Sequence, residues 1–169
     1  MNSIELVREA VIANGKVILP FSGKSMYPTL KDAMVVTISR ILPESIRIAD
    51  IIAYQENDQV AAHRVIKIKR DNGAISFITK GDNQPFGGIA EVRQKDLIGR
   101  INCAFYADSD GKNILNENII FRLFYVGLGR IYLFYRKALR DHMPDSLRLF
   151  LKTLVGNIYC CFQGCSSKG

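Results

Sequence analysis

The sequence predicts a mainly β fold, in which a β body with a short N-terminal helix is followed by a C-terminal two-helix tail. Short apolar segments rich in Val and Ile, separated by turn residues, recur up to residue 106 and are typical of strands. Beyond residue 118 the apolar segments lengthen and take on helical spacing. We therefore divide the chain into a body, residues 1–112, and a tail, residues 113–169.

Residues 2–14 predict the N-terminal helix. Ile4, Val7 and Val11 recur at helical spacing, with charged residues between them. Asn14 followed by Gly15 is a typical helix end.

Strands are expected between turn signals along the rest of the body. Asp71-Asn72-Gly73 predicts a tight hairpin, and residues 22–32 and 81–95 contain the glycine and proline of loops. A further turn is expected at residues 108–111. The expected strands are residues 16–21, 33–39, 50–55, 59–69, 74–80 and 97–106.

The tail predicts two helices, residues 119–141 and 145–162, separated by a polar connection that contains Pro144. Residues 1–118 hold 15 Lys and Arg against 14 Asp and Glu, whereas residues 119–169 hold 8 against 2. The net charge of +7 therefore comes mostly from the tail, which also holds nine of the sixteen Phe and Tyr residues.

Three interpretations of residues 119–162 stay open: packing on the β body, peripheral contact with a membrane surface, or contact with nucleic acid. No helix-turn-helix precedes the body, so no nucleic-acid partner is expected. We expect no signal peptide, because charged residues interrupt the N-terminus, and no membrane-spanning helix. A location in the cytoplasm or at the membrane periphery follows as the expectation.

The four cysteines predict neither a disulfide framework nor a metal site. Three of them lie near the C-terminus, and no CxxC pair or histidine stands at metal-ligand spacing. We interpret them as free thiols of a reducing compartment and expect no metal and no cofactor.

Ser25 is the first candidate for chemistry. It lies in Gly23-Lys24-Ser25-Met26, where a glycine lets backbone N–H groups approach a reacting carbonyl and hold its negative charge. A serine hydroxyl also needs a base that removes its proton. Taken alone, a serine in such a loop is more often a turn residue.

His63 and Asp82 are the candidates for that base and its orienting carboxylate. His63 lies mid-strand among small apolar residues, which leave room for a serine loop or a substrate. Asp82 follows a strand in Lys80-Gly81-Asp82-Asn83, where it could orient a histidine or simply cap a turn. The other histidine, His142, is interpreted as a surface or capping residue.

Together these segments resemble the signal peptidase I and repressor-autoprotease superfamily of serine peptidases. Five boxes occur in the family's order over residues 21–101. The strand box at residues 50–54 is preceded by Ala49, where the family usually has glycine. The boxes are the nucleophile segment at residues 23–29 and the segments at residues 50–54, 62–66, 79–83 and 97–101.

The resemblance implies a signal-peptidase-like catalytic domain in residues 1–112, with Ser25 as acylating nucleophile, His63 as base and Asp82 as orienting residue. Histidine at position 63 is similar to the histidine-base branch. The Ser25 amide would belong to the oxyanion hole, and Gly23, Lys24 and Met26 would flank the bound peptide. Residues 84–89 contain no acid that could complete a triad, so a Ser–His dyad assisted by Asp82 is the alternative to a full triad.

The implied substrate is a signal, leader or precursor peptide with small residues before the cut. The competing interpretation is a catalytically inactive form of the same fold that binds peptides or membrane surfaces.

Overall fold

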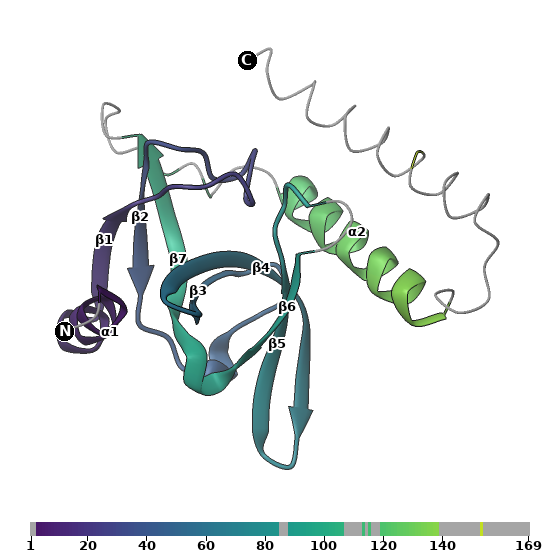
Figure 1. Ribbon diagram of the computed structural model, residues 1–169, viewed down its shortest axis with the longest axis horizontal. Helices are drawn as coiled ribbons and strands as arrows, with labels where there is room; N and C mark the ends of the chain where they lie inside the picture. The colour runs from purple at the N-terminus through teal and green to yellow at the C-terminus, as the bar shows by residue number, and fades with distance from the viewer. Residues whose placement is uncertain are drawn as a thin grey trace.

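The computed structural model describes residues 3–84, 88–106 and 119–138, together with Asn113, Leu115 and Thr153. Within these residues, seven strands form one curled antiparallel sheet in the order β1-β2-β7-β3-β4-β5-β6, which confirms the mainly β prediction (Figure 1). The helices and strands are α1 (Ser3–Asn14), β1 (Lys16–Pro20), β2 (Met34–Ser39), β3 (Ile51–Glu56), β4 (Gln59–Asp71), β5 (Ala74–Lys80), β6 (Ile89–Arg93), β7 (Leu97–Tyr106) and α2 (Ile119–Ala138).

Local sequence patterns explain α1 and the β4–β5 hairpin. Ile4 and Val11 of α1 are buried against the sheet, and the helix ends before Gly15. Asn72 and Gly73, which join β4 to β5, both have positive φ, at 46° and 81°. This is the backbone of the tight hairpin turn that an Asn-Gly pair favours.

Two strands organise the sheet around the candidate site. β7 pairs with β2 on one side and β3 on the other, so it joins the first two strands to the rest of the sheet. β4 has 13 residues and curls as it passes from its pairing with β3 to its pairing with β5 (Figure 1). His63 lies where β4 changes partner.

Two apolar clusters stabilise the body. The first lies between α1, the strands β2, β3 and β7 and the loop that joins β1 to β2, and it includes Met26 and Leu30 of that loop. The second lies on β3 to β6 and includes Tyr54 and Val65. The loop that carries Ser25 is therefore anchored in the core by its own apolar side chains.

The N-terminal half of the tail packs on the body. Tyr125 and Val126 of α2 are buried, and Gly129 lies so close to Ile66 that an added Cβ would come within 2.8 Å of that side chain. The Arg130 Nε donates to the Ile66 carbonyl at 3.3 Å. The first tail helix is thus confirmed over Ile119–Ala138, while the second, residues 145–162, lies outside the described residues apart from Thr153.

One segment differs from the prediction. Residues 89–93, expected to be part of a loop, form the edge strand β6, which pairs with β5. This strand of five residues follows a segment rich in Gly and Pro, so its pairing with β5 rather than a local pattern determines it. The turn expected at residues 108–111 lies outside the described residues.

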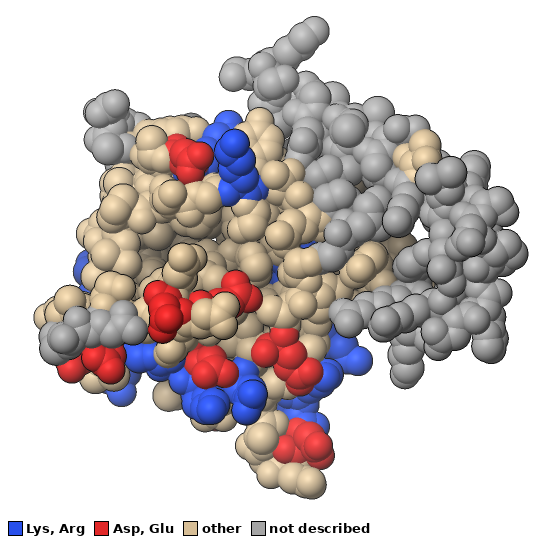
Figure 2. All heavy atoms as spheres, in the orientation of Figure 1, with Lys and Arg blue, Asp and Glu red and all other residues tan. Residues whose placement is uncertain are grey.

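The charge distribution of the body agrees with its near-neutral balance. Figure 2 shows acidic and basic side chains interspersed on one face of the described residues. No helix among the described residues has both the length and the apolar character needed to cross a membrane.

Candidate active site

Ser25 lies in the loop of residues 21–33, which joins β1 to β2 and is called the serine loop below. The Gly23 N–H donates to the Asp32 carboxylate at 2.8 Å, and the Leu30 N–H donates to the Met26 carbonyl at 2.9 Å. Met26 is fully buried, whereas Ser25 is only partly buried. The loop therefore holds the Ser25 hydroxyl next to a fixed buried anchor.

The backbone of Ser25 packs against the segment that follows β5. The Asn83 N–H donates to the Ser25 carbonyl at 2.7 Å. A Cβ added to Gly81 would lie 2.6 Å from that carbonyl oxygen and 3.2 Å from the Ser25 Cβ. Only glycine permits this approach, so Gly81 and Asn83 hold Ser25 at the end of β5.

A buried ion pair holds the same loop from a second side. Arg64 and Asp82 are each 2% exposed and bind through two contacts, Nε to Oδ1 at 2.8 Å and Nη2 to Oδ2 at 2.5 Å. The Thr29 hydroxyl, in the serine loop, donates to Asp82 Oδ2 at 2.5 Å and accepts from Arg64 Nη2 at 3.2 Å. These three residues are called the Arg64 clamp below.

The Arg64 guanidinium also contacts a backbone carbonyl and an aromatic ring. Arg64 Nη1 donates to the Ala49 carbonyl at 3.0 Å, and the Arg64 guanidinium lies 5.8 Å from the centroid of the Tyr125 ring. Burial lowers the pKa of Arg64, but the Asp82 carboxylate outweighs burial and the pKa is raised overall. Arg64 is therefore permanently charged.

His63 is buried, and its ring has one hydrogen bond among the described residues. The Tyr54 hydroxyl lies 2.8 Å from His63 Nδ1, and the same hydroxyl donates to Glu56 Oε1 at 3.5 Å. Burial lowers the pKa of His63, the charges of Glu56 and Asp82 act in the opposite direction, and Lys80 lowers it further. The imidazole is therefore neutral at neutral pH, as a general base must be.

The strand register brings Ser25 and His63 to one corner of the sheet. Arg64 of β4 pairs with Lys80 of β5, so His63 and Gly81 occupy the next positions along the two chains. Because Ser25 packs against Gly81, the nucleophile candidate lies beside the strand that carries the base candidate. Among the described residues, no hydrogen bond joins Ser25 to His63 in this structure.

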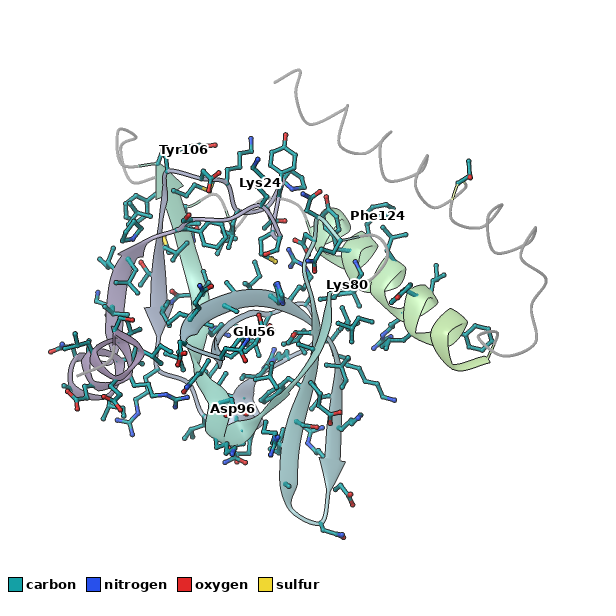
Figure 3. All side chains as sticks on the ribbon, in the orientation of Figure 1. Lys24, Glu56, Lys80, Asp96, Tyr106 and Phe124 are labelled. Carbon is teal, nitrogen blue, oxygen red and sulfur yellow. The ribbon has the colours of Figure 1, made fainter. Side chains whose placement is uncertain are left out.

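Lys80 is a buried amine at the same corner. The residue is 3% exposed, its Nζ donates to the Gly81 carbonyl at 3.3 Å, and burial lowers its pKa to about 8 against the opposing charge of Asp82. Figure 3 shows Lys80 at the end of β5, below the loop that carries Lys24. Among the described residues the Lys80 amine is bound to a carbonyl alone, so it adds a titratable positive charge to the site.

The other predicted site residues, Asp82, Lys24 and Met26, lie in three different environments. Asp82, expected beside His63, instead gives its two carboxylate oxygens to Arg64 and Thr29, and Tyr54 occupies Nδ1 of His63. Lys24 is exposed on the serine loop, while Met26 is a core residue.

Sequence reasoning missed the roles of Tyr54, Arg64 and Lys80. An arginine and a lysine in apolar strands were the available signal, because a buried cation requires a carboxylate or carbonyl partner. Tyr54 carried no such signal, since an aromatic residue is ordinary in a strand.

Ala49 stands where the family that the sequence resembles usually has glycine. Its φ is 77°, a left-handed conformation that favours glycine, which is the family's usual residue there. Ala49 still places its backbone correctly, since its N–H donates to the Val65 carbonyl at 2.8 Å. The alanine therefore strains the turn without disrupting it.

The site has one backbone donor for an oxyanion, and the described part of the chain holds no candidate metal-binding cluster. The Ser25 N–H has no hydrogen-bond partner among the described residues, so it can donate to an incoming carbonyl oxygen. Across residues 3–84, 88–106 and 119–138, no cluster of three His, Cys, Asp or Glu side chains could hold a metal ion.

Comparison with known proteins supports the resemblance to signal peptidases. The chain is similar to the signal peptidase complex catalytic subunit SEC11C of dog, human and mouse. Each is 31% identical over 94 residues, which cover 50% of this chain and 48% of the relative. The chain thus spans about half the length of the curated relatives it matches, and no protein-family model matches it. The similarity supports the signal peptidase superfamily and does not distinguish its histidine branch.

Proposed function

We propose that this chain is a serine endopeptidase that cleaves signal, leader or precursor peptides through an acyl-enzyme. The observation that carries the proposal is the position of Ser25. This residue is partly exposed and packs against Gly81, close to His63, at the corner where β4 changes its pairing from β3 to β5. The similarity to a signal peptidase catalytic subunit agrees with this chemistry.

In the proposed mechanism, His63 Nε2 removes the proton from the Ser25 hydroxyl as the oxygen attacks the scissile carbonyl. The Ser25 N–H donates to the oxyanion. His63 then gives its proton to the leaving amine, which departs and leaves an ester on Ser25. A water molecule deprotonated by His63 hydrolyses that ester, and the proton returns to Ser25.

Asp82 contributes to this mechanism through position and charge. Its bonds to Arg64 and Thr29 hold the serine loop on β4, and its negative charge favours the protonated form of His63. The dyad of Ser25 and His63 therefore carries out the proton transfers, with Asp82 as the supporting carboxylate.

We further propose that the substrate binds as an extended strand beside the serine loop. Among the described strands β1 lies at the edge of the sheet and leads directly into this loop, so its outer edge can pair with a peptide backbone. Gly23 and Lys24 would then flank the scissile bond, above the buried Met26.

A serine-directed phosphonate tests the nucleophile. We expect mass spectrometry to place the adduct on Ser25 of the full chain, with labelling absent in Ser25→Ala and His63→Ala. Ser22→Ala is the matched control, because Ser22 is an exposed serine of the same loop and should not affect labelling. A folded protein that stays unlabelled would favour the inactive peptide-binding alternative.

We also propose peripheral membrane contact through the outer face of α2. Leu123 and Ile131 are each 60% exposed and Phe134 is 70% exposed, and residues 119–169 carry most of the positive charge. Sedimentation with anionic vesicles should capture the protein, and Leu123→Ser with Phe134→Ser should weaken capture. Equal capture of this variant, or binding to DNA instead, would contradict the proposal.

A further inference from the structure

The ring of His63 is held by a tyrosine, where serine peptidases of the triad type use a carboxylate. Tyr54 and His63 lie on the same face of the β3–β4 pair, because Ile52 is the residue directly opposite His63 and Tyr54 is two positions further along β3. Both side chains are buried, their ring centroids are 5.8 Å apart, and the hydroxyl lies 2.8 Å from Nδ1.

Glu56 is a second partner of the Tyr54 hydroxyl. Tyr54 donates to Glu56 Oε1 at 3.5 Å, and with its proton directed there its oxygen can accept from His63 Nδ1. Glu56 is exposed at the end of β3 (Figure 3). It supplies the negative charge at the end of the series of contacts from His63 through Tyr54 to Glu56. Burial and the charge of Glu56 raise the pKa of Tyr54 to about 12 against a hydrogen bond with Thr79 that lowers it, so the hydroxyl keeps its proton.

We propose that Tyr54 is a positioning residue whose hydroxyl accepts the Nδ1–H of His63 while donating to Glu56. This places the proton of neutral His63 on Nδ1 and leaves Nε2 with the lone pair that Ser25 requires. The inference rests on the proposed role of His63 and assigns to Tyr54 and Glu56 the task expected of Asp82. Tyr54→Phe would fill nearly the same volume but could not determine which ring nitrogen of His63 carries the proton.

The charged groups around His63 determine the direction of the expected shifts. Glu56 of β3 and Asp82 after β5 favour the imidazolium, Lys80 of β5 disfavours it, and Tyr54 accepts its Nδ1–H. Loss of the hydroxyl or of the Glu56 charge therefore lowers the pKa of His63 further. A tyrosine with a purely packing role predicts no change in the tautomer of His63 on Tyr54→Phe, whereas the Glu56 charge acts on the pKa of His63 in either case.

Nitrogen-15 NMR of the imidazole tests the inference on the full chain. His142→Gln leaves His63 as the sole histidine, so its tautomer and titration can be followed directly. We expect the Nδ1–H tautomer in the parent, a shift toward Nε2–H in Tyr54→Phe, and a lowered pKa in Tyr54→Phe and Glu56→Gln. Tyr106→Phe and Glu91→Gln are matched controls on β7 and β6 and should change neither property.

Peptide cleavage then separates this inference from the proposed function. Tyr54→Phe should lower kcat by about 10- to 100-fold with KM unchanged, because only proton transfer is affected. An Nε2–H tautomer in the parent, or a tautomer unchanged in Tyr54→Phe, overturns the inference whatever the activity. An unchanged kcat overturns the positioning role. Cleavage that survives in Ser25→Ala would instead overturn the proposed function. Should Tyr54→Phe fail to fold, the tautomer of His63 in the parent carries the test.

Discussion

Gly81 lies against Ser25 so closely that an added Cβ would stand 2.6 Å from the Ser25 carbonyl oxygen. This backbone contact joins the serine loop to the end of β5, one register position from the pair formed by Arg64 and Lys80. The geometry of the proposed nucleophile therefore depends on the absence of a side chain at position 81.

Gly81→Ala should displace Ser25 while leaving the sheet folded. The new methyl group would push the Ser25 carbonyl away from the Asn83 N–H, so we expect kcat/KM to fall by at least about 100-fold, as small misplacements of a reacting group do. Gly127→Ala is the matched control, because its Cβ would contact nothing within 4 Å on α2. Unchanged cleavage by Gly81→Ala would contradict the role of this contact.

The Arg64 clamp predicts a large loss of stability when its charge balance is broken. Asp82→Asn leaves a buried guanidinium without its carboxylate, which costs about 3–5 kcal/mol of unfolding free energy in comparable pairs. Urea unfolding measures this loss. Neutralising the exposed pair of Lys69 and Glu91 should cost less than about 1 kcal/mol, and an equal cost at both sites would contradict the distinction.

An apolar replacement of the clamp separates stability from activity. Arg64→Met combined with Asp82→Leu removes both buried charges, so most of the stability lost in Asp82→Asn should return. Cleavage should stay low, because Thr29 and the serine loop would no longer be tied to β4. Recovery of full activity would show that the clamp has no role beyond stability.

Because Lys80 is buried, we expect the unfolding free energy of the body to rise as the pH increases from 7.5 to 9.5. Burial lowers the pKa of Lys80 from 10.5 to about 8, so across this range the unfolded chain binds more protons at this position than the native protein. The unfolding free energy therefore rises with pH. Urea unfolding at the two pH values should show this rise in the parent and its loss in Lys80→Met.

Lys80→Met should also move the acid limb of the cleavage profile to higher pH. The protonated amine lowers the pKa of His63, and the base must be neutral to accept the proton of Ser25. Removing the amine raises the pKa of His63, so activity should appear at a higher pH than in the parent. An acid limb that stays in place would mean that Lys80 does not interact with the proposed base, His63.

Much of the fold was predictable because its signals are local. Ile4 and Val11 sit at helical spacing in α1, and Asn72-Gly73 has the conformational freedom that its hairpin uses. The edge strand β6 was missed, because its pairing with β5 involves residues that no local pattern connects. Tertiary pairing determines such short strands.

The candidate site was predictable in its residues and less so in its connections. Ser25 and His63 follow from the order of the motifs, and the structure brings their segments to one corner of the sheet. The partners of Asp82 and His63 depend on the side to which each strand turns its side chains. A shift of one residue in register exchanges these sides, so a sequence alone could not separate Tyr54 from Asp82 as the partner of His63.

Incubation of the purified chain and of Ser25→Ala with a diverse peptide library, read by mass spectrometry, tests the central claim most directly. We predict cleavage after small residues by the parent at neutral and mildly alkaline pH, and none by Ser25→Ala. Cleavage that survives in Ser25→Ala, or a folded parent that cleaves nothing even with lipid vesicles present, would contradict the assignment of a serine endopeptidase.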